Sequence, residues 1–477
     1  MGSVRRIAAN TISLSIAEII VKVAQFIIFV YVARQLGNAI FGRFNFAYSF
    51  SLIAVIFTDI GINYMIIREI SRKKELLNKF IINSFLIKIA LGIAVFALSV
   101  IVLNALNYPK ETQILVYLLM LYMFLRSGTE FLFSILKAFE RMHYEALIKT
   151  AGIVLLLVFG IGSLMIKKDI VIFGLLFVII EFLVFLATFI VVMTKFVKIE
   201  LDIDFAFVKK IIKLAFPFTL SVVFAGIYFY IDTIMLSLMK GDVPVGIYSA
   251  SYNIALALLF IPGMYTFAIY PIISSNYEKF KKKVDFIYER SFKYLYILGL
   301  PISFGLFIIA RNIILFVYGQ NYSPSIIALK ILAWFILFKF LSYLTGTVLS
   351  SINKQKFRMY SQGIAAFLNL GLNLMLIPKY SFVGAGIATL ASEIFLFILT
   401  FIFVSRHFHA FNVLKILYKP LIAVVIMAAA VVFLKINMFA IIAIGAAVYF
   451  AVLFLLKAFD EGDYSLLKKL LKGGQPE

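Results

Sequence analysis

Cysteine is absent from this 477-residue chain. Without a thiol, the chain can have no disulfide framework, no thiolate metal site and no cysteine nucleophile. Charged residues are scarce too, at 14% against roughly 25% in soluble domains. Apolar residues make up 64% of the chain, and the mean hydropathy is +1.06. These proportions predict an integral membrane protein.

Nucleotide and metal sites are also missing from the sequence. It contains no GxxxxGK[ST] phosphate loop, which argues against nucleotide hydrolysis. Its three histidines, His143, His407 and His409, fall in predicted cytosolic loops, and His407-x-His409 has no apparent third ligand. We therefore predict no metal site and no cofactor.

Long apolar segments fill most of the chain. A helix needs about 20 apolar residues to cross about 30 Å of hydrocarbon, and it satisfies its own backbone hydrogen bonds in lipid. Fourteen segments meet this requirement, so the predicted fold is all-α and integral to the membrane, with about 14 transmembrane helices. They are residues 11–33, 44–66, 81–103, 114–136, 146–166, 170–194, 214–238, 247–275, 294–310, 325–351, 358–377, 383–404, 420–434 and 438–456.

Lysine and arginine are divided unevenly between the loops. If the N-terminus is cytosolic, the cytosolic segments hold thirty of the 45 basic residues and the outer loops hold nine. Because basic loops stay in the cytosol, this asymmetry predicts a protein of the cell membrane with both termini cytosolic. The expected partners of the basic loops are anionic lipid headgroups rather than nucleic acid.

A Gly-rich stretch occurs twice. Residues 37–48, GNAIFGRFNFAY, align with residues 241–252, GDVPVGIYSASY, at an offset of 204 that places Gly37 on Gly241 and Gly42 on Gly246. We expect Gly37 and Gly42 to shape a turn on the outer side. Both copies lie between a helix going out and a helix coming in, which predicts two parallel lobes about a pseudo-two-fold axis along the membrane normal.

The repeat divides the chain into four parts. Residues 1–194 form an N-terminal lobe of six helices, and residues 214–404 form a C-terminal lobe of six. Residues 195–213, which mix Phe, Ile and Lys, are predicted to be an amphipathic connector on the cytosolic membrane face. Residues 405–477 add helices 13 and 14 and a cytosolic tail.

Ionisable side chains inside the spans are the candidate functional residues, because charge at mid-membrane is costly and usually faces protein or a wet cavity. Lys22 lies near the midplane of the first helix, with Glu18 one turn before it and Gln25 on the same side. Arg126 and Glu130 repeat the i,i+4 spacing in the fourth helix. The alternative for both is a self-neutralising pair between packed helices.

Other deep polar residues flank the two repeats or lie in the C-terminal lobe. We predict that substrate contacts the cavity residues Lys22, Gln25, Arg126, Asn253 and Lys339. The predicted coupling or cavity carboxylates are Glu18, Asp59, Glu130 and Asp232. Lys149 and Lys330 lie near the ends of their spans and Lys88 about a third of the way into its span, and we expect all three to reach the headgroups along their alkyl stems.

Several stretches resemble a known family. Residues 369–388, NLGLNLMLIPKYSFVGAGIA, are similar to the paired asparagines, Ile-Pro and small-residue hairpin of the polysaccharide transporters, the Wzx-type flippases of lipid-linked oligosaccharides. These belong to the superfamily of multidrug, oligosaccharidyl-lipid and polysaccharide exporters. Pro378 is expected to end a helix there. The other similar stretches are RNIILFVYGQNY at 311–322, SSINKQKF at 350–357 and ARQLGNAIFGRF at 33–44.

The resemblance implies a flippase that moves an isoprenoid-linked oligosaccharide from the cytosolic to the outer leaflet. Its two lobes would surround a central cavity that opens alternately to each side, with H⁺ or Na⁺ as candidate coupling ions. It also implies cationic cavity residues that meet the lipid pyrophosphate, a role that Lys22, Arg126 and Lys339 match.

Three other functions stay open. The nearest is a cation-coupled multidrug antiporter of the same superfamily, with Asp59, Glu130 or Asp232 as the coupling carboxylate. A membrane glycosyltransferase is less compatible with the sequence, because no outer loop extends much beyond about ten residues to carry catalytic acids. A scaffold without transport is the third, although deep charges in both lobes argue against it.

Overall fold

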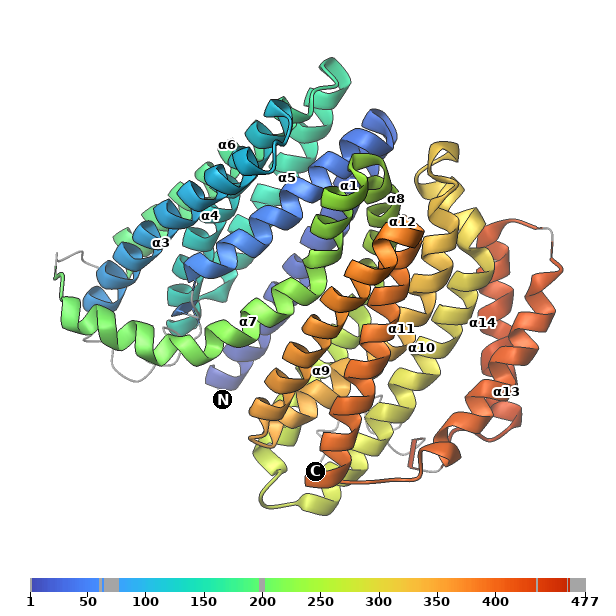
Figure 1. Ribbon diagram of the computed structural model, residues 1–477. Coiled ribbons are helices and arrows are strands. Elements are labelled where there is room, and N and C mark those ends of the chain that lie inside the picture. The colour runs from blue at the N-terminus through green and yellow to red at the C-terminus, as the bar shows by residue number, and fades with distance from the viewer. Residues whose placement is uncertain are drawn as a thin grey trace. The chain divides into compact units, whose positions relative to one another are not determined.

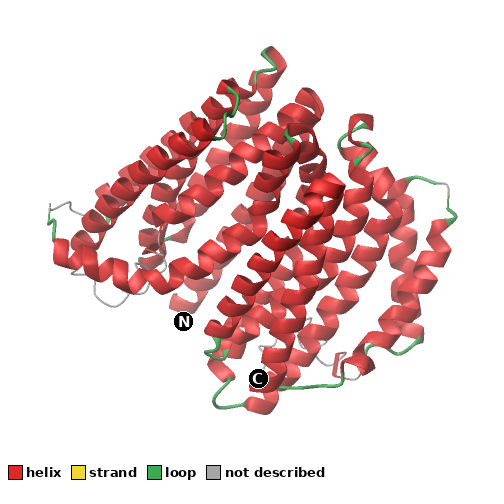
Figure 2. Cartoon of the chain, in the orientation of Figure 1, coloured by secondary structure: helices red, strands yellow, loops and turns green. Residues whose placement is uncertain are grey.

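Helices form nearly all of the computed structural model, which describes residues 2–59, 62–63, 77–196, 202–434, 436–460 and 462–463 (Figures 1 and 2). No strand occurs within these ranges. The helices are α1 (Gly2–Asp59), α3 (Leu77–Ala105), α4 (Lys110–Ala138), α5 (Met142–Ile166), α6 (Ile170–Lys195), α7 (Phe205–Lys240), α8 (Asp242–Leu258), α9 (Phe260–Asn276), α10 (Lys281–Val317), α11 (Ser325–Ser351), α12 (Gln355–His407), α13 (Val413–Val432) and α14 (Met438–Leu455).

The predicted all-α integral membrane fold is confirmed. Within the described ranges, twelve helical segments are long and apolar enough to cross a membrane, with α8 and α9 forming one of them. Single non-helical residues, Gly37 and Ser381, divide α1 and α12 into two spans each. The break in α12 lies three residues after Pro378, which stands inside the helix rather than at its end.

Gly37 and Gly241 adopt nearly the same backbone conformation. Their φ/ψ angles are 76°/176° and 81°/−169°, a region that side-chain-bearing residues rarely enter. Each glycine turns the chain from one helix into the next within a single residue, so the two repeats share their turn geometry. Gly42 does not shape the turn as expected, because it already lies in the helix that follows Gly37.

Replacing Gly37 or Gly241 by alanine should destabilise the protein by about 1–3 kcal/mol, the usual cost of holding a side-chain-bearing residue in a sparsely populated backbone region. Thermal unfolding of the detergent-solubilised chain measures this effect. Gly162→Ala in α5 is the matched control, since its φ is ordinary and an added Cβ would meet nothing within 4 Å. Equal midpoints for all three variants would contradict the assigned turn geometry.

The chain forms two compact units. The first unit comprises Met1–Ala250 and Gln362–Ala385, and the second comprises Ser251–Ser361 and Gly386–Glu477. In the first, α1 packs against α4, α5 and α7, and α4 packs against α6 (Figure 1). In the second, α10 packs along α11, and α13 pairs with α14. The unit boundaries differ from those of the predicted lobes, so the lobe division stays a prediction that rests on the repeat.

The segment before α7 is fixed to the start of α3. Asp204 caps α7 by accepting hydrogen bonds from the N–H groups of Ala206 and Phe207, at 2.9 and 3.0 Å. The hydrogen bond from Lys79 of α3, and then that from Phe207, hold the pKa of Asp204 below its usual value. Asn83 of α3 donates to the carbonyl of Asp202 and accepts from the N–H of Asp204. The predicted connector is therefore anchored at Asp202 and Asp204, near its middle, while residues 197–201 lie outside the described ranges.

Candidate functional site

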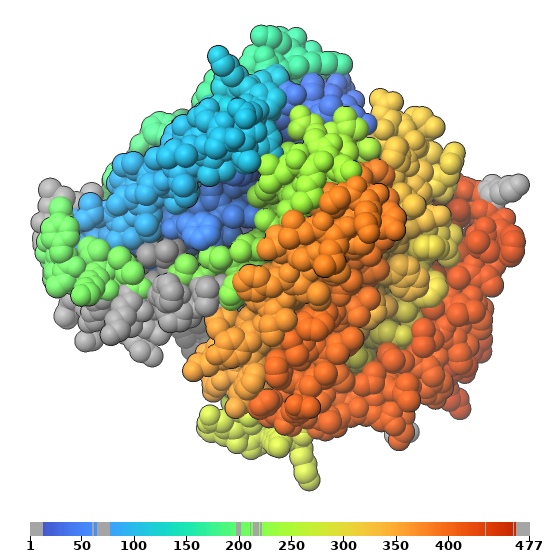
Figure 3. Space-filling model, viewed as in Figure 1, coloured from blue at the N-terminus to red at the C-terminus, as the bar shows by residue number. Residues whose placement is uncertain are grey.

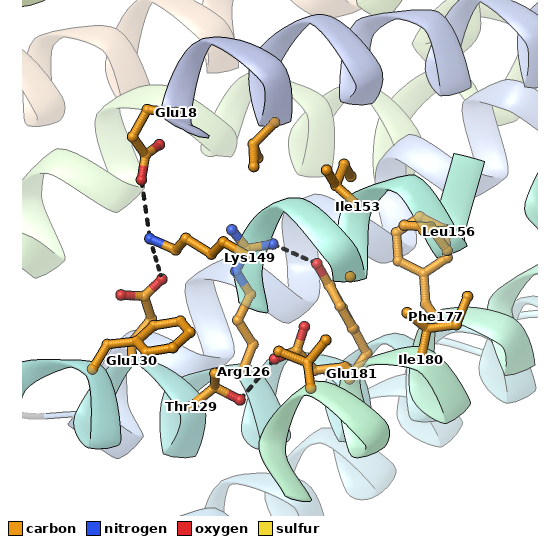
Figure 4. A pocket seen from close by; sticks show the side chains of 15 residues that line it. Glu18, Arg126, Thr129, Glu130, Lys149, Ile153, Leu156, Phe177, Ile180 and Glu181 are labelled. Atoms are coloured by element: carbon orange, nitrogen blue, oxygen red, sulfur yellow. Dashed lines mark hydrogen bonds and ion pairs between the residues drawn. The ribbon is translucent and has the colours of Figure 1, made fainter. Parts of the chain in front are cut away.

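A small polar cavity lies inside the first unit among α1, α4, α5 and α6 (Figure 4). Its volume is about 70 Å³, and apolar side chains such as Ile153, Phe177 and Ile180 surround its charged lining. Five of its lining residues are charged, and three of them, Glu18, Arg126 and Glu130, are among the predicted site residues. The charge cluster consists of the lining residues Glu18, Arg126, Glu130, Lys149 and Glu181 together with the adjoining Glu145.

Lys149 is the centre of this charge cluster. Its Nζ lies 3.0 Å from Glu18 of α1, 3.1 Å from Glu130 of α4 and 3.1 Å from Glu145 of α5. Figure 4 shows the ammonium between Glu18 and Glu130. The expectation that Lys149 reaches the lipid headgroups was wrong, because three carboxylates from three helices lie closer. One ammonium therefore connects α1, α4 and α5 inside the membrane.

Arg126 and Glu181 occupy the other side of the cavity. The Arg126 guanidinium donates a hydrogen bond of 2.5 Å to the Tyr122 hydroxyl, and Thr129 Oγ1 donates one of 2.8 Å to Glu181. Glu130 forms an ion pair with Lys149 rather than the self-neutralising i,i+4 pair with Arg126 that was the alternative interpretation. Glu130 and Glu181 thus find their partners across helices, whereas Arg126 bonds Tyr122 one turn earlier in α4.

Lys22 lies on the exposed surface of α1, one turn from the charge cluster. Among the described side chains, no carboxylate lies within the 4.0 Å ion-pair distance of Lys22, and Glu18 pairs with Lys149 instead. The charges of Arg126 and Lys149 lie near enough to act on it. Gln25, on the same helix, donates a 3.0 Å hydrogen bond to the Tyr48 hydroxyl beyond the Gly37 turn. Lys22 is therefore an exposed cation of α1 with no ion-pair partner among the described side chains.

Asp59 forms an ion pair with Lys88 of α3, and Lys88 also donates a 2.8 Å hydrogen bond to Ser127 of α4. The Lys88 side chain is buried, so the expectation that it reaches the headgroups was also wrong. As with Lys149, the nearest carboxylate lies on another helix and its position is invisible in the local sequence.

Asp232 is buried in the first unit within a hydrogen-bond network. Its two oxygens accept from the Tyr248 hydroxyl at 2.9 Å and from Asn373 Nδ2 at 2.5 Å. Asn373 Nδ2 also donates to Asn369. Asn373 of the 369–388 stretch thus holds the carboxylate and Asn369 holds Asn373, a role that sequence reasoning missed although their i,i+4 spacing places them on one helix face. Asn253, in the second unit, has a buried Nδ2 without a hydrogen-bond partner in the described chain.

Lys339 forms a buried ion pair in the second unit. Its Nζ lies 2.9 Å from Glu393 of α12, whose carboxylate also accepts a hydrogen bond from Ser342. Both charged side chains are almost inaccessible to solvent. This geometry favours a stabilising contact between α11 and α12.

Replacing Lys339 by methionine should destabilise the protein by about 3–5 kcal/mol, because it strands the Glu393 charge in the interior. The double variant Lys339→Met with Glu393→Leu removes both charges and should recover most of that loss. Thermal unfolding of the two variants measures the difference. If the single variant were as stable as the double variant, the buried pair would not be an ionic contact.

His409 contacts two acids of α10, Glu289 at 2.7 Å from Nε2 and Asp285 at 3.6 Å from Nδ1. These acids face opposite ring nitrogens, so one ion cannot bind between the imidazole and both carboxylates. No group of three metal-binding side chains is arranged for a metal among the residues that the structure describes.

The two repeats meet each other through their glycines. A Cβ added to Gly42 would lie 1.8 Å from the carbonyl oxygen of Asp242, and one added to Gly246 would lie 1.9 Å from that of Asn38. Asn38 and Asp242 are themselves equivalent at the offset of 204, so the contact is reciprocal. We call residues 38–42 and 242–246 the hairpin contact. Beside it, Arg43 forms ion pairs with Asp242, at 3.2 Å, and with Glu111.

Comparison with known proteins places these features in a family. Residues 7–277, more than half of the chain, match the model of the family described as polysaccharide biosynthesis protein. The chain belongs to the polysaccharide biosynthesis protein family. Residues 217–375 also match the MatE model. The resemblance to polysaccharide transporters is thereby confirmed.

Individual relatives agree with this family. The chain is 28% identical over 169 residues to the probable flippase AglR of Haloferax volcanii, and the match covers 35% of each chain. It is 25% identical over 171 residues to the probable low-salt glycan biosynthesis flippase Agl15 of the same organism, covering 35% of this chain and 36% of Agl15. These matches thus span little more than a third of either relative.

A solved structure shows the same fold along nearly the whole chain. The lipid II flippase MurJ in its inward closed conformation superposes with a TM-score of 0.77, over 94% of this chain and 99% of that one. The sequence identity is 19%, so the likeness concerns the fold.

Proposed function

We propose that this protein is a flippase that moves an isoprenoid-linked oligosaccharide from the cytosolic to the outer leaflet of the cell membrane. The family match over residues 7–277 carries the proposal, and the names of AglR and Agl15 as flippases support it. The protein then acts as a transporter rather than an enzyme. Both termini lie in the cytosol, as the distribution of basic residues favours.

Alternating access gives the hairpin contact a function. By the same distribution of charge, the Gly37 and Gly241 turns face outside, so the hairpin contact closes the outer end of the first unit. Glycines at positions 42 and 246 let two helix backbones touch there, and such a contact can separate without unpacking large side chains. The present structure then corresponds to the outward-closed state, and release of the substrate requires this contact to open.

Lys22 is the residue that we assign to the substrate's phosphates. It is an exposed mid-span cation, whereas Arg126 contacts Tyr122 and Lys339 pairs with Glu393. A charge-assisted hydrogen bond to phosphate favours passage of the headgroup through the apolar interior. Gln25 and Asn253 provide neutral polar contacts in the same proposal, and the basic loops contact anionic lipid headgroups.

Lys22→Ala should lower the rate of flipping at least about tenfold, since a charged hydrogen bond contributes roughly 1.5–3 kcal/mol. Proteoliposomes carrying a fluorescent polyprenyl diphosphate glycan measure the rate by the loss of headgroup protection from an external quencher. Lys22→Arg should retain most of it, and Lys168→Ala on an exposed loop is the control. Normal flipping by Lys22→Ala would remove Lys22 from the site.

A cation-coupled multidrug antiporter is the second candidate function. The MatE match at residues 217–375 favours it and contains both Asp232 and Asn373. In either function, the buried Asp232 is the carboxylate that we assign to H⁺ or Na⁺ coupling, ahead of Asp59, which pairs with Lys88. Drug-resistance assays on expressing cells, with and without sodium, separate the two: resistance without glycan flipping favours the antiporter.

A further inference from the structure

A second cavity of the first unit is almost wholly apolar. It has a volume of about 400 Å³ and lies between the second half of α1, α3 and α4. Of its twelve lining residues, only Ser51 and Thr58 are polar. This composition suits a hydrocarbon ligand. The apolar lining includes Val55, Ile89, Ile93, Phe96, Leu121 and Phe124.

The two hydroxyl groups of this pocket are already engaged. Thr58 Oγ1 donates a 2.7 Å hydrogen bond to the carbonyl of Val55, and Ser51 Oγ donates one of 3.5 Å to that of Val116. A sugar or phosphate in the pocket would lose its hydration and gain almost no polar partner. The pocket therefore excludes the headgroup of an amphiphile and admits its chain.

The pocket opens sideways into the surrounding hydrocarbon. Ile89, Ile93 and Leu121 line it, yet their exposed fractions are 47%, 66% and 44%. In Figure 3, α3 (light blue) lies on the surface of the first unit. On the inner side, Phe124 packs directly on the α3 backbone, since a Cβ on Gly92 would lie 2.3 Å from its ring. A lipid tail can thus enter the pocket laterally from the membrane, and the packed Phe124 side chain closes the inner side of the pocket.

The depth of the pocket in the membrane indicates which kind of lipid tail it suits. Gly92 and Ile93 stand at the middle of α3, and Leu121 and Phe124 near the middle of α4, so the pocket lies near the bilayer midplane. A site about 15 Å from either interface is reached equally from both leaflets. A lipid whose headgroup changes leaflet while its tail stays in the core can keep its tail at such a position in both states.

We propose that this pocket binds the tail of the isoprenoid substrate and retains it while the headgroup crosses. The proposal rests on the flippase function proposed above and adds to it the position of the lipid tail. The Lys88–Asp59 ion pair lies one helical turn from the pocket, toward the predicted cytosolic side. With the Lys88–Ser127 hydrogen bond it holds α1, α3 and α4 together and so closes that end of the pocket.

Photocrosslinking in proteoliposomes of the full chain tests this. One probe is a polyprenyl phosphate with a diazirine on its last isoprene unit, and the comparison probe is a phosphatidylglycerol with a diazirine at the end of one acyl chain. We expect the polyprenyl probe to label peptides of α3 and α4 that contain residues 89–97 and 120–124, with unlabelled polyprenyl phosphate competing. Ala97→Phe places a large side chain in the pocket. We expect it to reduce labelling about tenfold, because the probe tail would lose the binding free energy of burying roughly two methylene groups.

Ala94→Phe is the matched control, since Ala94 is an exposed residue of α3 outside the lining and should leave labelling unchanged. Equal labelling by both probes, or full labelling of Ala97→Phe, would overturn the proposal. The flipping rate, measured on the same vesicles, separates the two proposals. Flipping without pocket labelling overturns the tail site alone, whereas competed labelling without flipping overturns the flippase function and keeps the lipid site.

Discussion

Gly42→Ala and Gly246→Ala should each stop most transport, and to the same extent. Each added methyl group would lie within 2 Å of a backbone carbonyl oxygen, so no side-chain movement can relieve the clash. One helix must move, and overpacking of this kind costs about 1–3 kcal/mol. If this cost falls on the outward-closed state alone, it lowers the equilibrium population of that state by roughly tenfold to a hundredfold.

The reciprocal geometry makes this expectation specific. Because Gly42 meets Asp242 as Gly246 meets Asn38, the two variants should slow flipping equally, and the double variant should slow it further. Their thermal unfolding in detergent should change less than that of Gly37→Ala, since the helices keep their other contacts. Gly162→Ala controls for the loss of a helical glycine with free space around it. Wild-type flipping in either variant would show that the hairpin contact plays no part in transport.

Lys149→Met should be the most destabilising single substitution in the first unit. Removing the ammonium leaves Glu18 and Glu130 without their cation, whereas the buried Glu145 keeps Lys137 at 3.1 Å. Breaking a buried ion pair from one side costs about 3–5 kcal/mol. Glu18 is 41% exposed, so its share of that loss is small, and most of the cost arises at Glu130.

Thermal unfolding at two pH values checks this expectation. Lowering the pH should partly restore Lys149→Met, because protonation neutralises the carboxylates that the substitution leaves unpaired, while the wild type should gain nothing. Lys149→Arg keeps the positive charge and should lose less. Lys168→Met, on an exposed loop, should change nothing. A wild-type midpoint for Lys149→Met at neutral pH would show that Lys149 does not hold the charge cluster together.

The sequence is a good guide to the helices and a poor guide to the contacts between them. Apolar runs of about 20 residues mark each span because hydrocarbon thickness dictates helix length. The shared offset of Gly37 and Gly241 predicts the repeated turn, since few other residues adopt that conformation.

The sequence spacing shows only Glu145, four residues before Lys149, among the partners of Lys88 and Lys149. Spacing of i,i+4 reveals neighbours on one helix, whereas the carboxylates of Asp59 and Glu18 come from other helices. The Gly42 contact was also hidden, because it is made by a backbone carbonyl, a group that every residue carries. Packing between helices, rather than residue type, decides such contacts.

The most direct test of alternating access uses the absence of native cysteine. In the variant Arg43→Cys with Asp242→Cys, the two thiols are unique and stand where an ion pair of 3.2 Å now joins the repeats. A short bis-methanethiosulfonate crosslinker, which joins the two thiols through disulfides, should hold the hairpin contact shut and stop the flipping of a fluorescent polyprenyl diphosphate glycan in proteoliposomes. A reductant should restore it, and Arg43→Cys alone should be unaffected. Full flipping by the completely crosslinked protein would contradict the opening of this contact as a step of transport.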